Sequence, residues 1–331
     1  MNTAILGAGS WGTALALVLA RGGHPVQLWT RNPDFAKVLA RDRENFTYLP
    51  GIQLPELIQP TARLEECREA DCVLFVSPSL ALRHLAEQFA RVGLAERSVL
   101  ISCTKGIELD TGLRMTQLIA QHFPTNPVAV LSGPSHAEEV AGQRPTAVVL
   151  GATDHLIAVE LQKVIAGPAF RTYTSDDVAG IELGGALKNI FAIAAGISDG
   201  LGLGDNSKAA LITRALAELI RLGAALGGRR ETFQGLSGIG DLMVTCFSQH
   251  SRNRRVGERI AHGETLSNIA ESMQMIAEGV PTARSAWQCA LQLGIDAPIT
   301  GVVHAILYEN LAPAEGMRRL LARDLRPEMD R

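Results

Sequence analysis

The chain has 331 residues, of which 47% are hydrophobic and 20% charged, a composition typical of a globular protein. This length exceeds the usual size of a single hydrophobic core, so we expect two domains. The net charge of −3 provides no broad positive field, which argues against a nucleic-acid-binding protein or one held on an acidic membrane surface. A small anionic ligand would need a local positive pocket.

Cysteine and histidine spacing bears on compartment and metal binding. The cysteines are odd in number, scattered and without a C-x-x-C pair: Cys67, Cys72, Cys103, Cys246 and Cys289. We therefore expect free thiols in a reducing compartment. The histidines do not pair at ligand spacing, so we expect no metal site. Without a basic signal-peptide flank or about 18 uncharged apolar residues in a row, we expect a cytoplasmic protein with no membrane insertion.

The first half of the chain alternates short apolar runs with helical patterns. Strands are predicted at residues 3–6, 26–29, 72–76, 98–102, 128–131 and 147–150. Helices are predicted at residues 11–21, 80–91, 112–121 and 135–141. Continuous apolar strands that alternate with helices favour an α/β fold, in which a mostly parallel, doubly wound sheet is covered on both faces.

The second half has a different pattern. Helical segments follow one another at residues 178–198, 207–226, 252–262, 266–275, 280–293, 299–308 and 314–322, with no strand candidate between them. We expect a Rossmann-like nucleotide-binding domain over residues 1–175 and an all-helical, substrate-binding and catalytic domain over residues 176–331.

A glycine-rich loop opens the chain. Gly7, Gly9 and Gly12 form G-x-G-x-x-G directly after the first predicted strand and at the start of an apolar helix. In a dinucleotide-binding loop the first glycine makes the tight turn, the second lets the backbone approach the pyrophosphate, and the third permits close helix packing. The N–H groups of the helix start then attract the phosphates. The alternative is a glycine-rich turn that binds nothing.

The end of the second predicted strand bears on the choice of cofactor. NAD-selective sites usually carry an acidic residue there, but residues 28–32 read LWTRN, with Arg31 at that place. A guanidinium suits a 2′-phosphate, so we predict that NADP(H) is preferred and NAD(H) is accepted. Asp34 comes too late for this role and is expected to cap the next helix. The alternative for Arg31 is a solvated loop arginine.

Five further segments occur in order along the chain. They are residues 102–108 (SCTKGIE), 131–137 (LSGPSHA), 184–190 (GGALKNI), 236–246 (LSGIGDLMVTC) and 251–255 (SRNRR). With the glycine loop, the chain resembles the bacterial-type NAD(P)-dependent glycerol-3-phosphate dehydrogenases from residue 4 to about residue 308. The resemblance implies hydride transfer between NAD(P)H and dihydroxyacetone phosphate, which gives sn-glycerol 3-phosphate for glycerophospholipid synthesis.

The resemblance implies roles for four polar residues. Lys188, in an otherwise apolar helical segment, becomes the proton donor in ketone reduction, where negative charge develops on oxygen. Burial would lower its pKa toward the working pH. Lys105, at a strand end, is placed beside substrate and cofactor, while Asp241 and Thr245 orient Lys188 and the substrate hydroxyls. The alternatives are solvated lysines and, for Asp241, a helix cap.

Residues 251–255 are the expected phosphate pocket. The resemblance assigns Ser251, Arg252 and Asn253 to the substrate phosphate, and Arg252 also to the cofactor. Guanidinium groups and a helix start both suit phosphate oxygens. Arg254 and Arg255 do not share a helix face with Arg252, so at least one is expected to be structural. The alternative is a solvated basic face.

Residues near two loops complete the expected site. The resemblance places Gly133 and Ser135 at the substrate and Ala137 at the nicotinamide. Ser135 and Glu138 also have the spacing of a capping box, the alternative interpretation.

Four more residues are assigned to the cofactor. Ser10 and Trp11 are expected at the pyrophosphate, and the resemblance implies that Ile276 and Glu278 reach the cofactor from the helical domain. A helix that stops at Gly279 is the simpler interpretation of the last segment.

Two other functions remain open from the sequence. A β-hydroxyacid or 6-phosphogluconate-type dehydrogenase also joins a Rossmann-like domain to a helical one and uses a helix lysine. A non-catalytic NADPH-binding module is the second alternative, against which Lys105, Lys188 and Asp241 argue. The long helical domain is compatible with a homodimer.

Overall fold

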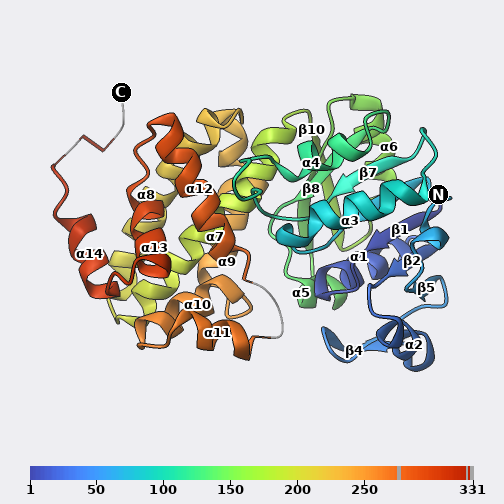
Figure 1. The fold of residues 1–331 in the computed structure, drawn as a ribbon, viewed down its shortest axis with the longest axis horizontal. Coiled ribbons are helices and arrows are strands. Elements are labelled where there is room, and N and C mark those ends of the chain that lie inside the picture. Colours follow the sequence, from blue (N-terminus) through green and yellow to red (C-terminus); the bar gives the residue numbers. More distant parts are fainter. Residues whose placement is uncertain (274–276, 326, 329–331) are drawn as a thin grey trace.

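The chain forms a sheet covered by helices, followed by a body of helices alone (Figure 1). This is a computed structural model, and it describes residues 1–273, 277–325 and 327–328. Strand β10 ends at Ser175, and the first helix of the helical body begins at Val178.

The sheet has eight strands in the order β10-β9-β8-β7-β6-β1-β2-β5. Their bounds are β1 (Thr3–Leu6), β2 (Val26–Trp29), β5 (Ile58–Thr61), β6 (Cys72–Phe75), β7 (Val99–Ser102), β8 (Val128–Ser132), β9 (Thr146–Gly151) and β10 (Phe170–Ser175). Neighbours pair in parallel, except that β8 and β9 are antiparallel. Because the strand order reverses between β1 and β6, ligands are expected at the carboxyl ends of these two strands.

Helices cover both faces of this sheet. They are α1 (Ser10–Arg21), α2 (Pro33–Asp42), α3 (Ser79–Val92), α4 (Met115–His122), α5 (Ala137–Ala141) and α6 (His155–Ile165). Successive strand side chains point to opposite faces: Ile5 and Leu74 join the core under α1, α5 and α6, whereas Leu6 and Phe75 join the core under α3 and α4. The predicted fold class is confirmed.

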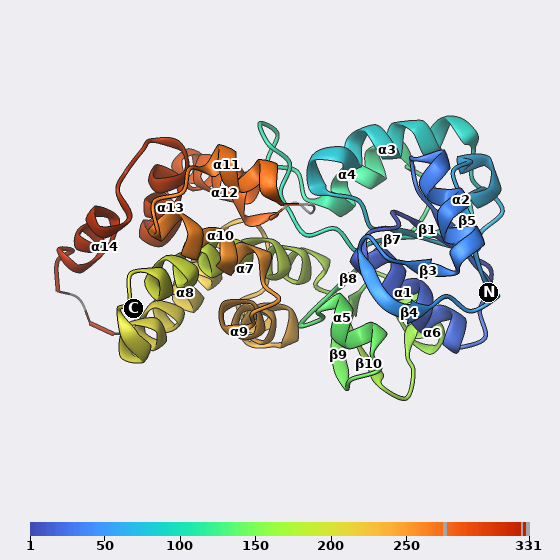
Figure 2. The ribbon, with the colours of Figure 1, turned by 90° about the horizontal axis from the view of Figure 1, so that it is seen from below.

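A long central helix organises the helical body (Figure 2). The helices are α7 (Val178–Gly200), α8 (Gly204–Ala225), α9 (Asp241–Phe247), α10 (Arg252–Ala261), α11 (Leu266–Ser272), α12 (Gly279–Leu293), α13 (Pro298–Tyr308) and α14 (Pro313–Leu321). By length and composition α7 could cross a membrane, but 89% of its most apolar window is buried inside the protein. It is therefore the core helix around which α8, α9, α10 and α12 pack.

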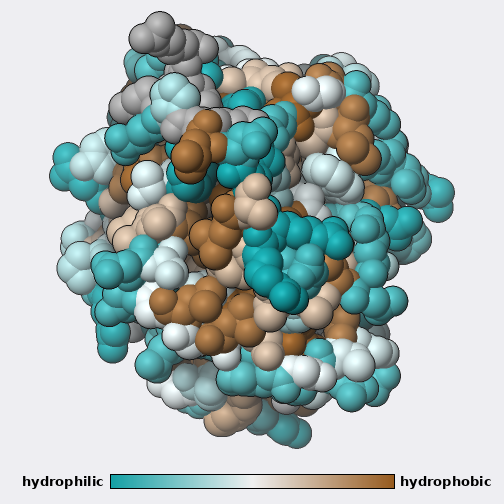
Figure 3. All heavy atoms as spheres, turned by 90° about the vertical axis from the view of Figure 1, so that its left-hand side faces the viewer, coloured by the Kyte–Doolittle hydropathy of each residue, from teal (hydrophilic) through white to brown (hydrophobic). Residues whose placement is uncertain are grey.

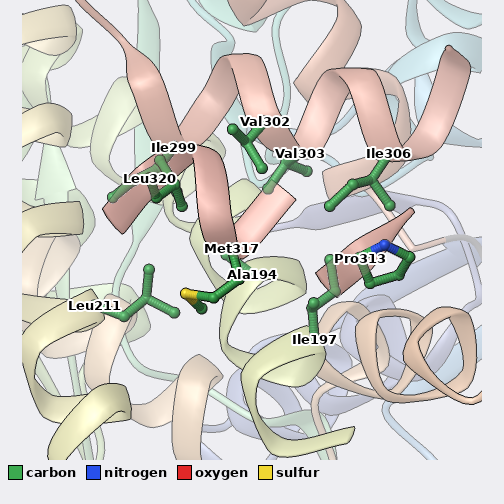
Figure 4. A pocket seen from close by; sticks show the side chains of 10 residues that line it. All are labelled: Ala194, Ile197, Leu211, Ile299, Val302, Val303, Ile306, Pro313, Met317 and Leu320. Carbon is green, nitrogen blue, oxygen red and sulfur yellow. The ribbon is translucent and has the colours of Figure 1, made fainter. Parts of the chain in front are cut away.

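The last helix closes the end of this body. Side chains of α7, α8, α13 and α14 line a small apolar pocket, and Figure 4 shows them pointing toward one another: Ala194, Ile197, Leu211, Ile299, Val302, Val303, Ile306, Pro313, Met317 and Leu320. Its lining is apolar throughout, so α14 is held by hydrophobic packing.

Several elements differ from the sequence predictions. Strands β5 and β10, helix α6, and a hairpin of β3 (Glu44–Asn45) and β4 (Leu49–Gln53) were not predicted, and α2 and α9 were expected only as helices beside Asp34 and Asp241, without bounds. The strands β5 and β10 are the two edges of the sheet, where polar residues and Pro60 are tolerated, so the continuous apolar signal is absent. Part of the helix predicted at 266–275 lies outside the described residues, and α11 ends at Ser272.

Three short helical turns also occur among the described residues. They are the 3₁₀ helices η1 (Leu64–Cys67) and η2 (Arg230–Gln234) and the π-helical turn η3 (Leu236–Gly240). The turn η3 leads directly into α9, which begins at Asp241. Because π-helical turns are rare and often occur at functional sites, η3 indicates a functional site at the start of α9.

Two glycines bring α10 against α7. A β-carbon at Gly196 would lie 1.9 Å from the carbonyl oxygen of Arg254, and one at Gly257 would lie 2.0 Å from that of Ile193. The two backbones therefore touch directly, which fixes the first turn of α10 beside α7.

Replacing Gly257 with Ala should force these backbones apart. We expect Gly257→Ala to lower the free energy of unfolding by about 1–3 kcal/mol, the usual cost of overpacking, in urea titrations. The control is Gly167→Ala, since a β-carbon there meets no atom within 4 Å. Equal unfolding midpoints for the two variants would contradict the backbone contact.

Candidate active site

The glycine loop has the steric features of a dinucleotide site. Gly7 has φ +136°, and a β-carbon on it would lie 2.5 Å from the carbonyl oxygen of Val76. One on Gly12 would lie 1.8 Å from the carbonyl oxygen of Gly7. Gly9 differs, because a β-carbon there meets nothing within 4 Å. The first and third glycines thus serve close packing, while the second leaves open space at the start of α1 that fits a phosphate group.

The residues expected beside this loop lie at its edge. Ser10 is buried at the start of α1, and Trp11 is half-buried, with its ring centroid 6.5 Å from that of Phe170. The indole Nε1 of Trp11 is buried without a hydrogen-bond partner within the described protein. Both residues occupy the first turn of the helix, where the N–H groups have no intrahelical acceptor.

Arg31 is exposed just beyond the end of β2. The next residue, Asn32, caps α2, since its Oδ1 accepts hydrogen bonds from the N–H groups of Asp34 at 2.9 Å and Phe35 at 3.2 Å. The expectation that Asp34 caps this helix is wrong. Asn reaches the first N–H groups from a position before the helix, whereas Asp34 already lies in its first turn.

Four polar residues from three parts of the chain, the segment after β7, α7 and α9, meet in one cluster. Asp241 accepts from the Nζ of Lys188 through Oδ1 at 2.8 Å and from the Nζ of Lys105 through Oδ2 at 2.6 Å. Lys188 also donates to Thr245 Oγ1 at 2.5 Å, and Lys105 to the carbonyl oxygen of Gly133 at 3.1 Å. Asp241 is only 1% exposed and Lys188 6%. The structure therefore brings the four predicted catalytic residues together.

Small residues on α7 make room for this cluster. A β-carbon at Gly184 would lie 2.5 Å from the carbonyl oxygen of Ser237 in η3, and one at Gly185 would lie 2.3 Å from Ser132 Oγ at the end of β8. One turn before Lys188, the helix thus has no side chain on the faces that meet η3 and the sheet. This lets Lys188 approach the carboxyl edge of the sheet.

Burial and mutual charge set the protonation of the cluster. Burial, aided by the positive charge of Lys105, lowers the pKa of Lys188 to about 8, although Asp241 opposes this shift. Burial alone would raise the pKa of Asp241, but the two ammonium groups outweigh it and hold this pKa below its ordinary value. A lysine that titrates near neutral pH beside a fixed carboxylate suits general acid–base chemistry.

A histidine at the site received no role from the sequence. Burial, followed by the charges of Lys188 and Lys105, lowers the pKa of His136, which therefore favours its neutral form. Its ring lies 5.7 Å from that of His250, which comes from the loop before α10. His136 lies in the segment 131–137, but no sequence signal relates it to His250, so only the folded arrangement shows that they meet.

Ser251, which the sequence assigned only to the substrate phosphate, also caps the start of α10. Ser251 precedes the helix, and its Oγ accepts from the N–H of Arg254 at 3.2 Å. Arg254 binds Asp199 through Nε at 2.6 Å and Glu258 through Nη2 at 2.7 Å. Arg254 is therefore structural, as expected for one of these arginines.

Arg252 and Asn253, which precede Arg254, are less exposed than the residues of a solvated basic face would be. Arg252 is half-buried, and burial lowers its pKa while Glu278 and Glu138 act to raise it. Asn253 is buried, with Oδ1 accepting from the N–H of Gly279 at 2.8 Å and Nδ2 donating to Asn189 Oδ1 at 2.9 Å. The Asn253 amide thus joins α7, α10 and α12.

The capping interpretations of two residues are wrong. Ser135 Oγ donates to the carbonyl oxygen of Gly133 at 3.0 Å, and α5 begins two residues later without a side-chain cap. Asp241 is the first residue of α9 and directs its carboxylate to the lysines rather than to the helix N–H groups. Ala137, the first residue of α5, is buried.

The last predicted segment joins the two parts of the chain. Glu278 accepts from the N–H of Ser79 at 3.0 Å and from its Oγ at 2.5 Å, which attaches the loop before α12 to the start of α3. Gly279 begins α12, so the interpretation as a helix stop is wrong. Ile276 lies outside the described residues.

The His, Cys, Asp and Glu side chains bear on metal binding and on disulfide formation. Within residues 1–273, 277–325 and 327–328, no group of three or more His, Cys, Asp or Glu side chains is arranged to hold a metal ion. The five cysteines are buried and free, as the sequence predicted.

Comparison with known proteins identifies the family. Residues 2–158 match the N-terminal family model of NAD-dependent glycerol-3-phosphate dehydrogenase, and residues 177–318 match its C-terminal model. The chain belongs to this dehydrogenase family. It is 48% identical over 327 residues to the glycerol-3-phosphate dehydrogenase [NAD(P)+] of Thioalkalivibrio sulfidiphilus, with 98% of both chains covered. It is 45% identical to that of Pelodictyon phaeoclathratiforme over 334 residues, with 100% of both covered.

A solved structure of the family has the same fold. The glycerol-3-phosphate dehydrogenase of Coxiella burnetii superposes with a TM-score of 0.93 at 40% sequence identity, covering 97% of this chain and 99% of the other. The family resemblance seen in the sequence is confirmed, and so is the order of a Rossmann-like part followed by a helical part.

Removing the carboxylate of Asp241 should leave Lys105 and Lys188 without the counter-charge that they share. We expect Asp241→Asn to lower the free energy of unfolding by about 3–5 kcal/mol at pH 7, because the ammonium group of buried Lys188 and that of half-buried Lys105 lose their counter-charge. The loss should shrink as pH rises toward about 8 and then stay constant. Without Asp241 the folded pKa of Lys188 falls further below its ordinary value of 10.5 than in the wild type, where it is about 8. Between these two folded pKa values only the variant gains stability from the greater proton binding of its unfolded chain.

The control is Asp34→Asn, which removes an exposed ion pair with Lys37. Its cost should stay below about 0.5 kcal/mol at every pH. If Asp241→Asn unfolded at the same urea concentration as this control, the carboxylate would not be holding the lysines together.

Proposed function

We propose that this enzyme interconverts dihydroxyacetone phosphate and sn-glycerol 3-phosphate as an NAD(P)-dependent oxidoreductase. The observation that carries the proposal is the buried ammonium of Lys188, held between Asp241 and Thr245, with a pKa of about 8. It lies at the carboxyl edge of a sheet whose glycine loop has room for a dinucleotide. The names of the family's members, glycerol-3-phosphate dehydrogenase [NAD(P)+], support the substrate.

Lys188 serves as the general acid for reduction of the ketone. Its Nζ holds a proton that passes to the ketone oxygen as negative charge develops there, and Lys105 adds a second positive charge beside it. Asp241 fixes both ammonium groups through its two oxygens, and Thr245 fixes the direction of Lys188. In the reverse direction the neutral amine of Lys188 accepts the proton of the hydroxyl group.

The cofactor is held by residues from both parts of the chain. The reduced nicotinamide, when bound, supplies the hydride. We assign the phosphates and ribose to the glycine loop and its flanks: Gly7, Gly9, Ser10, Trp11, Gly12 and Arg31. We assign the nicotinamide side to Lys105, Ala137, Arg252, Ile276 and Glu278, of which Ile276 lies outside the described residues.

The substrate phosphate is assigned to the start of α10. Arg252 provides the guanidinium, and Ser251 lies beside it at the helix cap. Asn253 contributes the amide hydrogen that is not donated to Asn189, since its Oδ1 is already held by Gly279. Gly133 and Ser135 border the carbon skeleton of the substrate, next to Lys105.

The wider assignments follow from this activity. Residues 1–175 form the nucleotide-binding domain and residues 176–331 the substrate-binding and catalytic domain. We place the enzyme in the cytoplasm without membrane insertion, where its product feeds glycerophospholipid synthesis. A homodimer is supported by apolar patches on the face that carries α14 (Figure 3) and by Leu321, which is 78% exposed.

Loss of the proton donor tests this function directly. We expect Lys188→Ala to lower kcat for dihydroxyacetone phosphate reduction by about 10²–10⁴-fold, measured as NADPH oxidation. In the wild type, kcat/KM for reduction should fall as pH rises above about 8, because only protonated Lys188 can donate. Arg252→Ala should mainly raise the substrate KM.

The control is Lys163→Ala, since Lys163 is exposed on α6. It should keep the wild-type kcat and pH profile. Near-native turnover by Lys188→Ala would rule out its role as the acid. Turnover of a hydroxyacid but not of dihydroxyacetone phosphate would favour a β-hydroxyacid dehydrogenase, and cofactor binding without any turnover would favour a binding module.

We also propose that Arg31 makes the enzyme prefer NADP(H) while NAD(H) is still accepted. Its exposed guanidinium beyond β2 can bind a 2′-phosphate. Arg31→Asp should weaken NADPH binding by about 10-fold or more and leave NADH binding equal or tighter, as measured by fluorescence titration with both nucleotides. Unchanged NADPH affinity would contradict this assignment.

A further inference from the structure

A buried asparagine outside every motif contacts the glycine loop. Asn45 ends β3 and is 0% exposed. Its Nδ2 donates to the carbonyl oxygen of Ala8 at 3.1 Å and to Thr13 Oγ1 at 2.8 Å, while its Oδ1 accepts from the N–H of Tyr48 at 3.1 Å. A single amide therefore joins the β3–β4 hairpin to the middle of the loop and to the first turns of α1.

This contact completes a pattern in the loop carbonyl groups. The carbonyl oxygen of Gly7 lies against Gly12, and that of Gly9 accepts from the N–H of Thr13 at 3.0 Å. The carbonyl oxygen of Ala8 is the third, and it is held by Asn45. The carbonyl oxygens of residues 7–9, between β1 and α1, thus each contact another group of the protein. This matters for an anion, because a carbonyl oxygen that faced a phosphate would repel it.

The hairpin that carries Asn45 is itself firmly anchored. Leu49 and Leu54 are buried in the core beneath α1, together with Leu15 and Leu17 of that helix. Figure 2 shows β3 and β4 beside α1. The amide of Asn45 is therefore a fixed group and not a mobile side chain that only follows the loop.

We propose that Asn45 is a positioning residue for cofactor binding: it holds the Ala8 peptide so that the loop presents its N–H groups to the dinucleotide pyrophosphate. The inference rests on the proposed function, because it takes the dinucleotide site as given. Asn45 acts on the cofactor through the loop, so it affects cofactor affinity rather than the proton transfer at Lys188.

The test compares Asn45→Ala with a matched asparagine. Asn126 also donates through its side-chain amide to backbone carbonyl groups, those of Ala95, Glu96 and Ser98, far from the glycine loop in the sequence. We expect Asn45→Ala to raise the Kd and KM for NADPH by roughly 5- to 30-fold, with kcat at saturating NADPH within about twofold of the wild type. Asn126→Ala should lower Tm but leave the NADPH Kd within about twofold.

Asn45→Asp provides a second variant that keeps the volume of the side chain. A carboxylate cannot donate to the Ala8 carbonyl group and adds negative charge near the phosphates, so its NADPH Kd should rise more than that of Asn45→Ala. This variant is decisive if Asn45→Ala does not fold.

Each outcome bears on one proposal or the other. If either folded Asn45 variant binds NADPH with the wild-type Kd, or if both lose kcat while KM for NADPH stays unchanged, the positioning role is overturned. If the wild type itself binds neither NADPH nor NADH, the proposed function fails and the role of Asn45 fails with it. If the Asn45 variants bind NADPH more weakly while the wild type and Asn126→Ala bind it normally, both the positioning role and the proposed function are supported.

Discussion

The candidate site depends on one carboxylate that two ammonium groups share. Lys105 comes from the carboxyl edge of the sheet, whereas Lys188 and Asp241 come from α7 and α9 of the helical body. Two lysines in a buried site would repel each other, and Asp241 brings both within hydrogen-bonding distance of the same group. Burying these charges is costly, so the cluster is better explained by the chemistry of its protons than by stability. The same contact joins the two parts of the chain at the reacting centre.

Two other carboxylates of the helical part also reach the sheet part. Glu182 of α7 accepts from Thr116 N–H at 2.8 Å and from Arg114 Nη1 at 2.5 Å, at the start of α4. Glu278 contacts Ser79 at the start of α3 in the same way. The N–H groups at a helix start need an outside acceptor, and an acidic residue is favoured there. The two parts of the chain are therefore joined by polar contacts whose geometry is directional, which is what a site for hydride and proton transfer requires.

The sequence predicted the parts of this molecule whose signals are local. The glycine loop, the central apolar strands and the apolar surroundings of Lys188 are each visible within a few residues. Edge strands β5 and β10 escaped because an edge tolerates polar residues. The capping box at Ser135 was wrong because its spacing fits a helix that begins one residue earlier than the one that forms. The pairing of Lys188 with Asp241, 53 residues away, followed from family resemblance and not from spacing.

The glycine loop shows why a local motif leaves part of a site undetermined. Its glycines explain where the backbone has room, since two of them pack against backbone atoms and the third faces open space. Room alone does not decide whether a peptide presents its N–H or its carbonyl oxygen to a phosphate. In this chain that choice is associated with Asn45, which is 37 residues from Ala8 and lies in an unpredicted hairpin. A polar residue outside every motif can thus determine which backbone groups of a distant motif face a ligand. The orientation of a peptide group depends on the partner that satisfies its buried carbonyl oxygen.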